Sequence, residues 1–103
     1  MIQIRIQQHE DEIREITITG HAGTADHGHD LVCAAVSAVS FGILNALDEL
    51  AGTIELSAVN NKVHIKADGN NPTEQIILKT GIIQLKTIQE SNQESIKIYQ
   101  SEV

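Results

Sequence analysis

The sequence predicts an α+β fold of two layers, with a mostly antiparallel sheet and two helices in the order ββαββαβ. Three observations predict it. Isoleucine alternates with polar residues near both ends of the chain, which is the period of a half-buried strand. From Leu31 to Leu47 the chain carries no charge, and its aliphatic residues recur at helical spacing. Asn71-Pro72 then opens a second helical stretch, because proline suits the first position of a helix.

The predicted sheet consists of two hairpins and a last strand. The first two strands carry the alternating isoleucines and form one hairpin, whose second strand ends at Gly20-His21. The other strands are expected at Thr53–Val59, Lys62–Ala67 and Ser95–Tyr99. Asn60-Asn61 suits the tight turn of the second hairpin.

The first helix is expected to begin at Asp30, a preferred N-cap residue, and to end at Gly52. Its apolar stripe follows helical spacing and consists of Val32, Val36, Val39, Ile43, Leu47 and Leu50. The other faces of its early turns carry small, uncharged residues. We therefore expect this helix to be covered on more than one side, and a second copy of the chain would supply that cover.

Composition limits the classes of function. The 103 residues suit a single domain that spans residues 1–103. A net charge of -7 and an aromatic content of 2% disfavour direct nucleic-acid binding and favour a basic peptide or protein as partner. The single cysteine cannot form an internal disulfide, and the first residues lack an apolar signal-peptide stretch. We expect a cytoplasmic location and no membrane partner, since the uncharged run is short for a membrane span.

Cys33 is the candidate nucleophile. It lies at the third position of the predicted helix, where the backbone N–H groups lack partners and the helix dipole is positive. Both features favour the thiolate, and the free N–H groups could also stabilise an oxyanion. Taken alone, however, a cysteine between valine and alanine on a helix is usually a small buried side chain.

His21 is the candidate general base, because it ends a rigid strand that can meet the start of the helix at one edge of the fold. The alternative is a histidine at the rim of the following loop. Asp30 either caps the helix or also orients His21, as the third group of a triad does. Ser37 lies one helical turn after Cys33, where it either lines the site or bonds to a backbone carbonyl.

The segment from Ala22 to Asp30 is rich in glycine and polar residues, so it is expected to be a loop. Its histidines, His27 and His29, allow an alternative hypothesis of a metal cluster with the neighbouring His21, Asp26, Asp30 and Cys33. Their spacing is not a recognised zinc pattern, and a glycine-rich loop is a poor rigid cage. We expect neither a metal nor a cofactor.

Residues Gly20 to Ser37 read G-H-A-G-x-A-x-x-G-x-D-L-V-C-A-A-V-S. This stretch resembles the signature of the bacterial ribosomal-processing cysteine proteases, the Prp family, with Leu31 where isoleucine is commoner. The length of the chain and its order of elements are similar to the family as well. A signature of this length is far more specific than a lone motif.

The resemblance implies an endopeptidase that removes a short N-terminal extension from a large-subunit ribosomal protein, number twenty-seven. It implies that Cys33 is the nucleophile and His21 its partner, with supporting positions at Gly20, Asp30 and Ser37. It also implies a homodimer and a loop that orders around the peptide. The alternative from another class is a non-catalytic, acidic binding module that assists a basic ribosomal protein during assembly.

Overall fold

The computed structural model describes residues 1–21 and 27–103, and within the first helix it describes side chains from Leu31 onward. Five strands and two long helices follow one another in the order ββαββαβ, as predicted. The elements are β1 (Ile2–His9), β2 (Glu12–Thr19), α1 (His27–Ala46), the short π-helix η1 (Leu47–Ala51), β3 (Leu56–Val59), β4 (Lys62–Lys66), α2 (Pro72–Glu90) and β5 (Ile96–Glu102).

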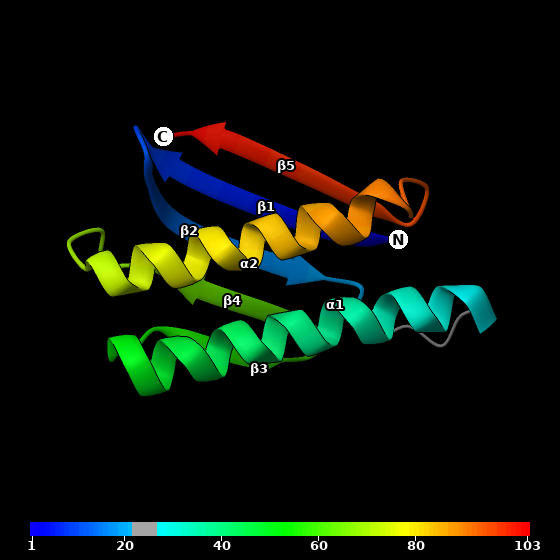
Figure 1. Ribbon diagram of the computed structural model, residues 1–103, viewed down its shortest axis with the longest axis horizontal. Coiled ribbons are helices and arrows are strands. Elements are labelled where there is room, and N and C mark those ends of the chain that lie inside the picture. Colours follow the sequence, from blue (N-terminus) through cyan, green and yellow to red (C-terminus); the bar gives the residue numbers. More distant parts are fainter. Residues whose placement is uncertain (22–26) are drawn as a thin grey trace.

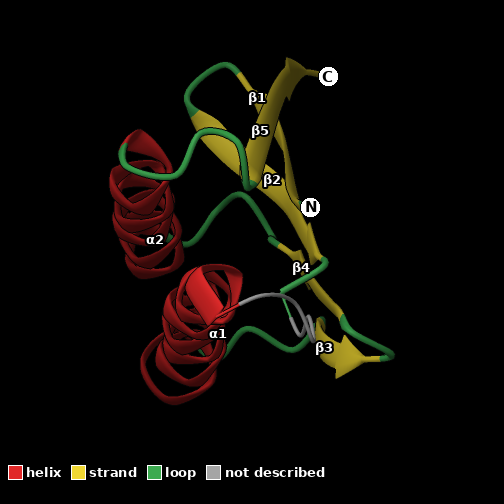
Figure 2. Ribbon diagram, turned by 90° about the vertical axis from the view of Figure 1, so that its right-hand side faces the viewer, coloured by secondary structure: helices red, strands yellow, loops and turns green. Residues whose placement is uncertain are grey.

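The strands form one sheet in the order β3-β4-β2-β1-β5. Every neighbouring pair is antiparallel except β1 and β5, which run parallel, so the expectation of a mostly antiparallel sheet is confirmed. Both helices run across the same face of this sheet and give the predicted two layers (Figures 1 and 2). In the end-on view of Figure 2, α1 lies beside β4 and β3, and α2 lies nearer β2 and β1.

Period-two alternation explains the register of the strands. Ile4 pairs with Ile18 across β1 and β2, so the isoleucines of both strands enter the core from one face. The second hairpin turns at Asn60 and Asn61, whose φ angles of 53° and 62° give the twist that a two-residue hairpin requires. Asparagine tolerates this left-handed conformation better than most residues.

The core between the layers is almost entirely aliphatic, as the low aromatic content predicts. It receives Val36 and Ile43 from α1 and Leu47 from η1. Val32 and Val39 of the predicted stripe contact it as well. Leu50 is 70% exposed, which corrects the prediction. Hydrogen bonds in the π-helical turn of η1 join residues five apart instead of four, so each turn holds more residues and α-helical spacing no longer places Leu50 on the buried face.

The first helix also begins earlier than predicted, at His27 instead of Asp30. Asp30 is therefore a residue of the first turn and not the N-cap. Gly28 disfavours a helix by about 1 kcal/mol, but each residue added to an existing helix contributes a hydrogen bond, so the helix extends through it. Cys33 consequently occupies the seventh position of α1, and not the third.

The stretch Leu31–Ala51 is long and apolar enough to cross a membrane by length and composition alone, with a mean hydropathy of 1.8. In this fold it packs against α2 and contributes a stripe to the core. The end of η1 adjoins the start of α2, where the Asn71 side chain donates to the Ala51 carbonyl over 2.9 Å. The same side chain caps α2 by accepting from the backbone N–H of Glu74.

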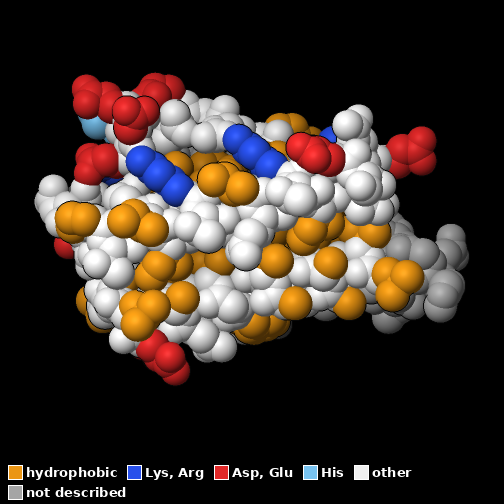
Figure 3. Space-filling view, in the orientation of Figure 1, with side chains coloured by type: hydrophobic (Ala, Val, Ile, Leu, Met, Phe, Trp, Pro, Cys, Tyr) orange, Lys and Arg blue, Asp and Glu red, His pale blue; other side chains and the backbone are white. Residues whose placement is uncertain are grey.

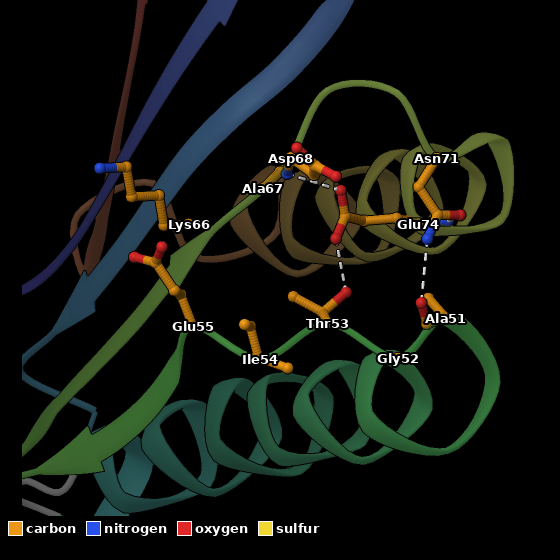
Figure 4. Close-up of a pocket in the computed structure, with 10 residues that line it drawn as sticks. All are labelled: Ala51, Gly52, Thr53, Ile54, Glu55, Lys66, Ala67, Asp68, Asn71 and Glu74. Atoms are coloured by element: carbon orange, nitrogen blue, oxygen red, sulfur yellow. Dashed lines mark hydrogen bonds between the residues drawn. The ribbon is translucent and has the colours of Figure 1, made fainter.

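Glu74 is 1% exposed and joins three segments at this end of the molecule (Figure 4). Its carboxylate accepts a hydrogen bond from the Thr53 hydroxyl at 2.5 Å and another from the backbone N–H of Asp68 at 2.9 Å. A buried carboxylate is tolerated when such donors satisfy it. These bonds fix where α1 ends relative to α2.

Two glycines within the helices offer a test of the packing between α1 and α2. A Cβ atom at Gly42 would meet nothing within 4 Å, whereas one at Gly81 would lie 2.3 Å from Cδ1 of Ile43. Both changes to alanine gain about 1 kcal/mol of helix propensity. We expect Gly42→Ala to raise the free energy of unfolding by about that amount. Gly81→Ala should lower it, because overpacking costs about 1–3 kcal/mol.

Chemical denaturation of both variants at equal protein concentration measures the difference. Equal stability of Gly42→Ala and Gly81→Ala would show that the helices are not in close contact at Ile43.

Candidate active site

The end of β2 turns towards α1 at Gly20. Its φ angle of +83° lies in the left-handed region, which glycine enters without strain. A Cβ atom here would also lie 2.3 Å from the backbone oxygen of Met1. No other residue fits both conditions, so glycine at this position is what allows the chain to leave the sheet and bring His21 against α1.

His21 and Ser37 make a two-part contact. The Ser37 hydroxyl donates to the backbone carbonyl of His21 at 3.2 Å, and its oxygen lies 2.9 Å from Nδ1 of the same residue. A serine hydroxyl has a single proton. With that proton placed on the His21 carbonyl, Nδ1 is assigned as the protonated ring nitrogen, which donates to Ser37 Oγ. The neutral ring therefore carries its lone pair on Nε2.

Nε2 of His21 is buried and has no hydrogen-bond partner in the described part of the chain. The whole residue is 5% exposed. Burial penalises the charged imidazolium and lowers the pKa of His21 below its ordinary value of 6.5. The arrangement gives a neutral imidazole at physiological pH with an unoccupied basic nitrogen, which is what a general base requires.

Cys33 is 5% exposed and lies at the edge of the aliphatic core. Its thiol points to the backbone carbonyl of Gly20, with Sγ 3.9 Å from that oxygen. The structure thus brings Cys33 to the segment that carries His21, although the thiol is directed at Gly20 and not at the imidazole. Cys33, His21, Ser37 and Gly20, all predicted as site residues, lie together.

The position of Cys33 in the helix changes one sequence-based expectation. As the seventh residue of α1, it lies beyond the four N–H groups that lack intrahelical partners. Its backbone N–H belongs to the hydrogen-bond ladder of the helix and is not free to bind an oxyanion. The effect of the helix dipole also falls off after the first turn.

Phe41 is a further neighbour that the sequence-based prediction missed. Its ring meets the His21 ring edge-on, with centroids 6.2 Å apart and planes at 67°. Cys33, Ser37 and Phe41 are each four residues apart and therefore lie on one face of α1. This spacing, and the fact that Phe41 is the single phenylalanine of the chain, are the features of the sequence that could have identified Phe41 as a neighbour of the site.

The remaining predicted residues lie at positions whose side chains are outside the described part. The backbone of Asp30, His27 and His29 belongs to the first turn of α1. Whether Asp30 orients His21 stays a prediction. Among the described residues, no group of three or more histidine, cysteine or acidic side chains is arranged to hold a metal ion.

Comparison with known proteins assigns the family. The family model described as Cysteine protease Prp matches residues 1–97. A ribosomal processing cysteine protease Prp from Staphylococcus aureus (strain Mu50 / ATCC 700699) is 38% identical over 95 residues, which cover 86% of this chain and 88% of that protein. A protein of the same name from Bacillus subtilis (strain 168) is 32% identical over 107 residues, covering 95% and 96%.

Solved structures agree with the sequence relatives. The crystal structure of an essential ribosomal processing protease Prp from S. aureus in complex with a substrate peptide has a TM-score of 0.89 and 32% identity, and the match covers 98% of this chain and 100% of that one. The same protease with a covalently linked product peptide has a TM-score of 0.86 and 33% identity, with the same coverage.

The match to the family model over nearly the whole chain, the sequence relatives and the solved structures all lead to the same assignment. Together with the convergence of Cys33 and His21 in the fold, they show that the chain belongs to the cysteine protease Prp family and is a hydrolase of the cysteine protease class.

Proposed function

We propose that the chain acts as one protease domain, residues 1–103, which removes the N-terminal extension of a large-subunit ribosomal protein, number twenty-seven. Cys33 is its nucleophile and His21 its general base. The observation that carries this assignment is the free, buried Nε2 of His21 on the segment that the Cys33 thiol contacts. The relatives that carry the name of ribosomal processing protease support the substrate.

The protonation state of the site sets the order of the steps. The Cys33 thiol turns from the Gly20 carbonyl to Nε2 of His21 and transfers its proton there. The thiolate attacks the scissile carbonyl carbon and forms a tetrahedral intermediate. The imidazolium then protonates the leaving amine as the C–N bond breaks and a thioester forms. Water, deprotonated by His21, hydrolyses that thioester and restores the thiol.

Ser37 holds the base in position through this cycle. Its oxygen accepts from Nδ1, so the basic lone pair stays on Nε2, and Nδ1–H stays paired when the ring becomes positive. Asp30 is the proposed second support of His21. Gly20 contributes the left-handed turn that lets the ring approach α1. The site uses no metal and no cofactor in this mechanism.

A homodimer in the cytoplasm is the proposed state of the enzyme. Figure 3 shows apolar side chains spread along the face that α1 and α2 present to the viewer. The exposed side chains of these helices include Ile76 at 67% and Ile83 at 65%. A groove of about 470 Å³ between the helices has mostly apolar walls. Exposed apolar side chains gathered around such a groove are typical of a surface that another chain covers.

The catalytic assignment is tested with the precursor of the ribosomal protein. Cys33→Ala and His21→Ala should lose cleavage at neutral pH, and Cys33→Ser should be nearly inactive because a hydroxyl ionises much less readily than a thiol. Mass spectrometry of the products measures this, and circular dichroism checks the fold. Cleavage of the precursor by Cys33→Ala at the wild-type rate would exclude the mechanism.

The pH profile tests the roles of burial and of Ser37. Burial lowers the pKa of His21 below 6.5, so the imidazole is still mostly neutral at pH 6.5. As the pH is lowered, kcat/KM should therefore begin to fall at a pH below that of an ordinary histidine. Ser37→Ala should lower kcat about ten-fold with little change in KM, while the acid limb stays below 6.5 because burial still sets it. Ser40→Ala, which removes a buried hydroxyl bonded only within the helix, is the matched control and should retain activity.

The proposed dimer is tested by introducing a charged side chain into the apolar face formed by α1 and α2. Ile76→Lys should shift the species in solution towards the 11.2 kDa chain mass, as measured by light scattering. Val103→Lys, at an exposed apolar side chain that follows β5, is the control and should leave the mass unchanged. A wild-type protein that is monomeric at micromolar concentration would contradict the proposal.

A further inference from the structure

β3 forms one edge of the sheet, and no strand pairs with its outer side in the described part of the chain. Its sequence, Leu-Ser-Ala-Val, contains no charge. Exposed edges are usually protected by charged side chains, because unpaired N–H and C=O groups bind other strands. β5 at the opposite edge follows this rule with Lys97 and Glu102. The edge strand β3 is therefore short, but no charged side chain within it protects its unpaired backbone groups.

The register of the hairpin shows which backbone groups are free. The Glu55 carbonyl accepts from the backbone N–H of Lys66 at 3.0 Å, so Glu55 faces β4. Backbone direction alternates along an antiparallel strand. Leu56 and Ala58 therefore direct their N–H and C=O groups to the open edge, and neither group takes part in the β3–β4 ladder.

A trough of about 460 Å³ lies between this edge strand and α1. It is lined by Leu44, Asn45, Asp48, Thr53, Ile54, Leu56, Ser57 and Ala58. Ile54, at the entrance of β3, is 91% exposed, so a large aliphatic side chain is available to a ligand there. Its lining combines aliphatic side chains with the polar side chains of Asn45, Thr53 and Ser57.

The trough leads to the catalytic residues along α1. Cys33, Ser37, Phe41 and Asn45 follow at spacings of four, so each lies beside the next, and the row winds about 40° around α1 with each step. Asp48 continues the row three residues later, in η1. Cys33 and Ser37 lie at the site, and Asn45 and Asp48 line the trough. Phe41 lies between them and touches His21.

The direction of β3, which forms the other wall of the trough, also leads towards the catalytic residues. Val59 at the end of β3 pairs with Lys62, and Lys62 pairs with Thr19, the residue before Gly20. The open edge of β3 therefore ends on the side of the sheet where β2 delivers His21. Figure 1 shows α1 and β3 both extending towards this end of the molecule.

We propose that the substrate peptide binds in this trough as an extended strand added to β3, which rests on the proteolytic function proposed above. The helical stretch from Cys33 in α1 to Asp48 in η1 rises about 22 Å, which an extended peptide spans with about seven residues. Residues about four to seven positions from the scissile bond contact Asn45 and Asp48. Main-chain hydrogen bonds to Leu56 and Ala58 hold the backbone, as in other strand-addition complexes.

The charge of the trough selects the class of peptide. Asp48 lines it, and Glu55 adjoins Ile54 at its entrance. With no basic side chain among the lining residues, the trough favours a peptide whose distal residues are basic.

Ala58→Pro tests the added strand, because proline removes an outward N–H without touching the β3–β4 ladder. For a ten-residue peptide that spans the cleavage sequence of the precursor, KM should rise about five-fold, the effect of one lost hydrogen bond. A short peptide that does not reach β3 should be cleaved by the variant as by wild type, which controls for folding. An unchanged KM for the long peptide would overturn the proposal.

Asp48→Lys and Glu49→Lys form a matched pair for the charge. The two residues are neighbours, both are exposed, and only Asp48 lines the trough. For the long peptide with lysines at its distal residues, Asp48→Lys should raise KM about three-fold at low salt and Glu49→Lys by less than two-fold. Equal effects of the two variants would contradict the proposed location.

A set of long peptides, each N-methylated at one backbone amide, gives a test that needs no change in the protein. An added strand bonds through alternate residues, so the loss of affinity for the Cys33→Ala protein should recur at every second position. A loss without this period would exclude strand addition. Cleavage of the precursor by the wild-type protein, measured in parallel, is unaffected by these outcomes and tests the proteolytic function separately.

Discussion

The contact between the end of β2 and the face of α1 is the constraint on which the site depends. Gly20 makes it possible, because the backbone there is left-handed and passes so close to Met1 that no Cβ atom fits. The turn places His21 beneath the helix instead of continuing along the sheet. The base is thus attached to the end of β2, an interior strand of the sheet, and reaches Ser37 from there.

One face of α1 packs into the hydrophobic core, and another face carries the side chains of the site. Val36 and Ile43 are buried in the core between the sheet and the helices, and this packing fixes the rotation of α1. Because helical geometry is regular, the same rotation presents Cys33 and Ser37 to the segment from β2. The hydrophobic core therefore sets the position of the nucleophile, and a change in packing along α1 would move the thiol relative to the imidazole.

The alternating isoleucines were sufficient to predict the sheet, and the spacing of aliphatic residues was sufficient to predict α1 and its contribution to the core. The signature around His21 and Cys33 identified residues that the fold does bring together. Sequence alone places the start of α1 too late, because Asp30 is a good N-cap and local propensity cannot show that the helix extends through Gly28. Leu50 was placed in the core because nothing in the sequence marks the π-helical turn of η1.

Two features could not come from sequence because they depend on which segments become neighbours. The tautomer of His21 is assigned from the single proton of Ser37, and that assignment needs the structure, which places the hydroxyl within hydrogen-bond distance of the His21 carbonyl. The open edge of β3 follows from the strand order, since any of the strands could have been outermost. An uncharged edge strand is a liability for a protein that has no use for it. In this fold the open edge lies beside the helix that carries Cys33. An extended peptide that pairs with β3 is therefore aligned along α1 towards the thiol, and the edge serves substrate binding.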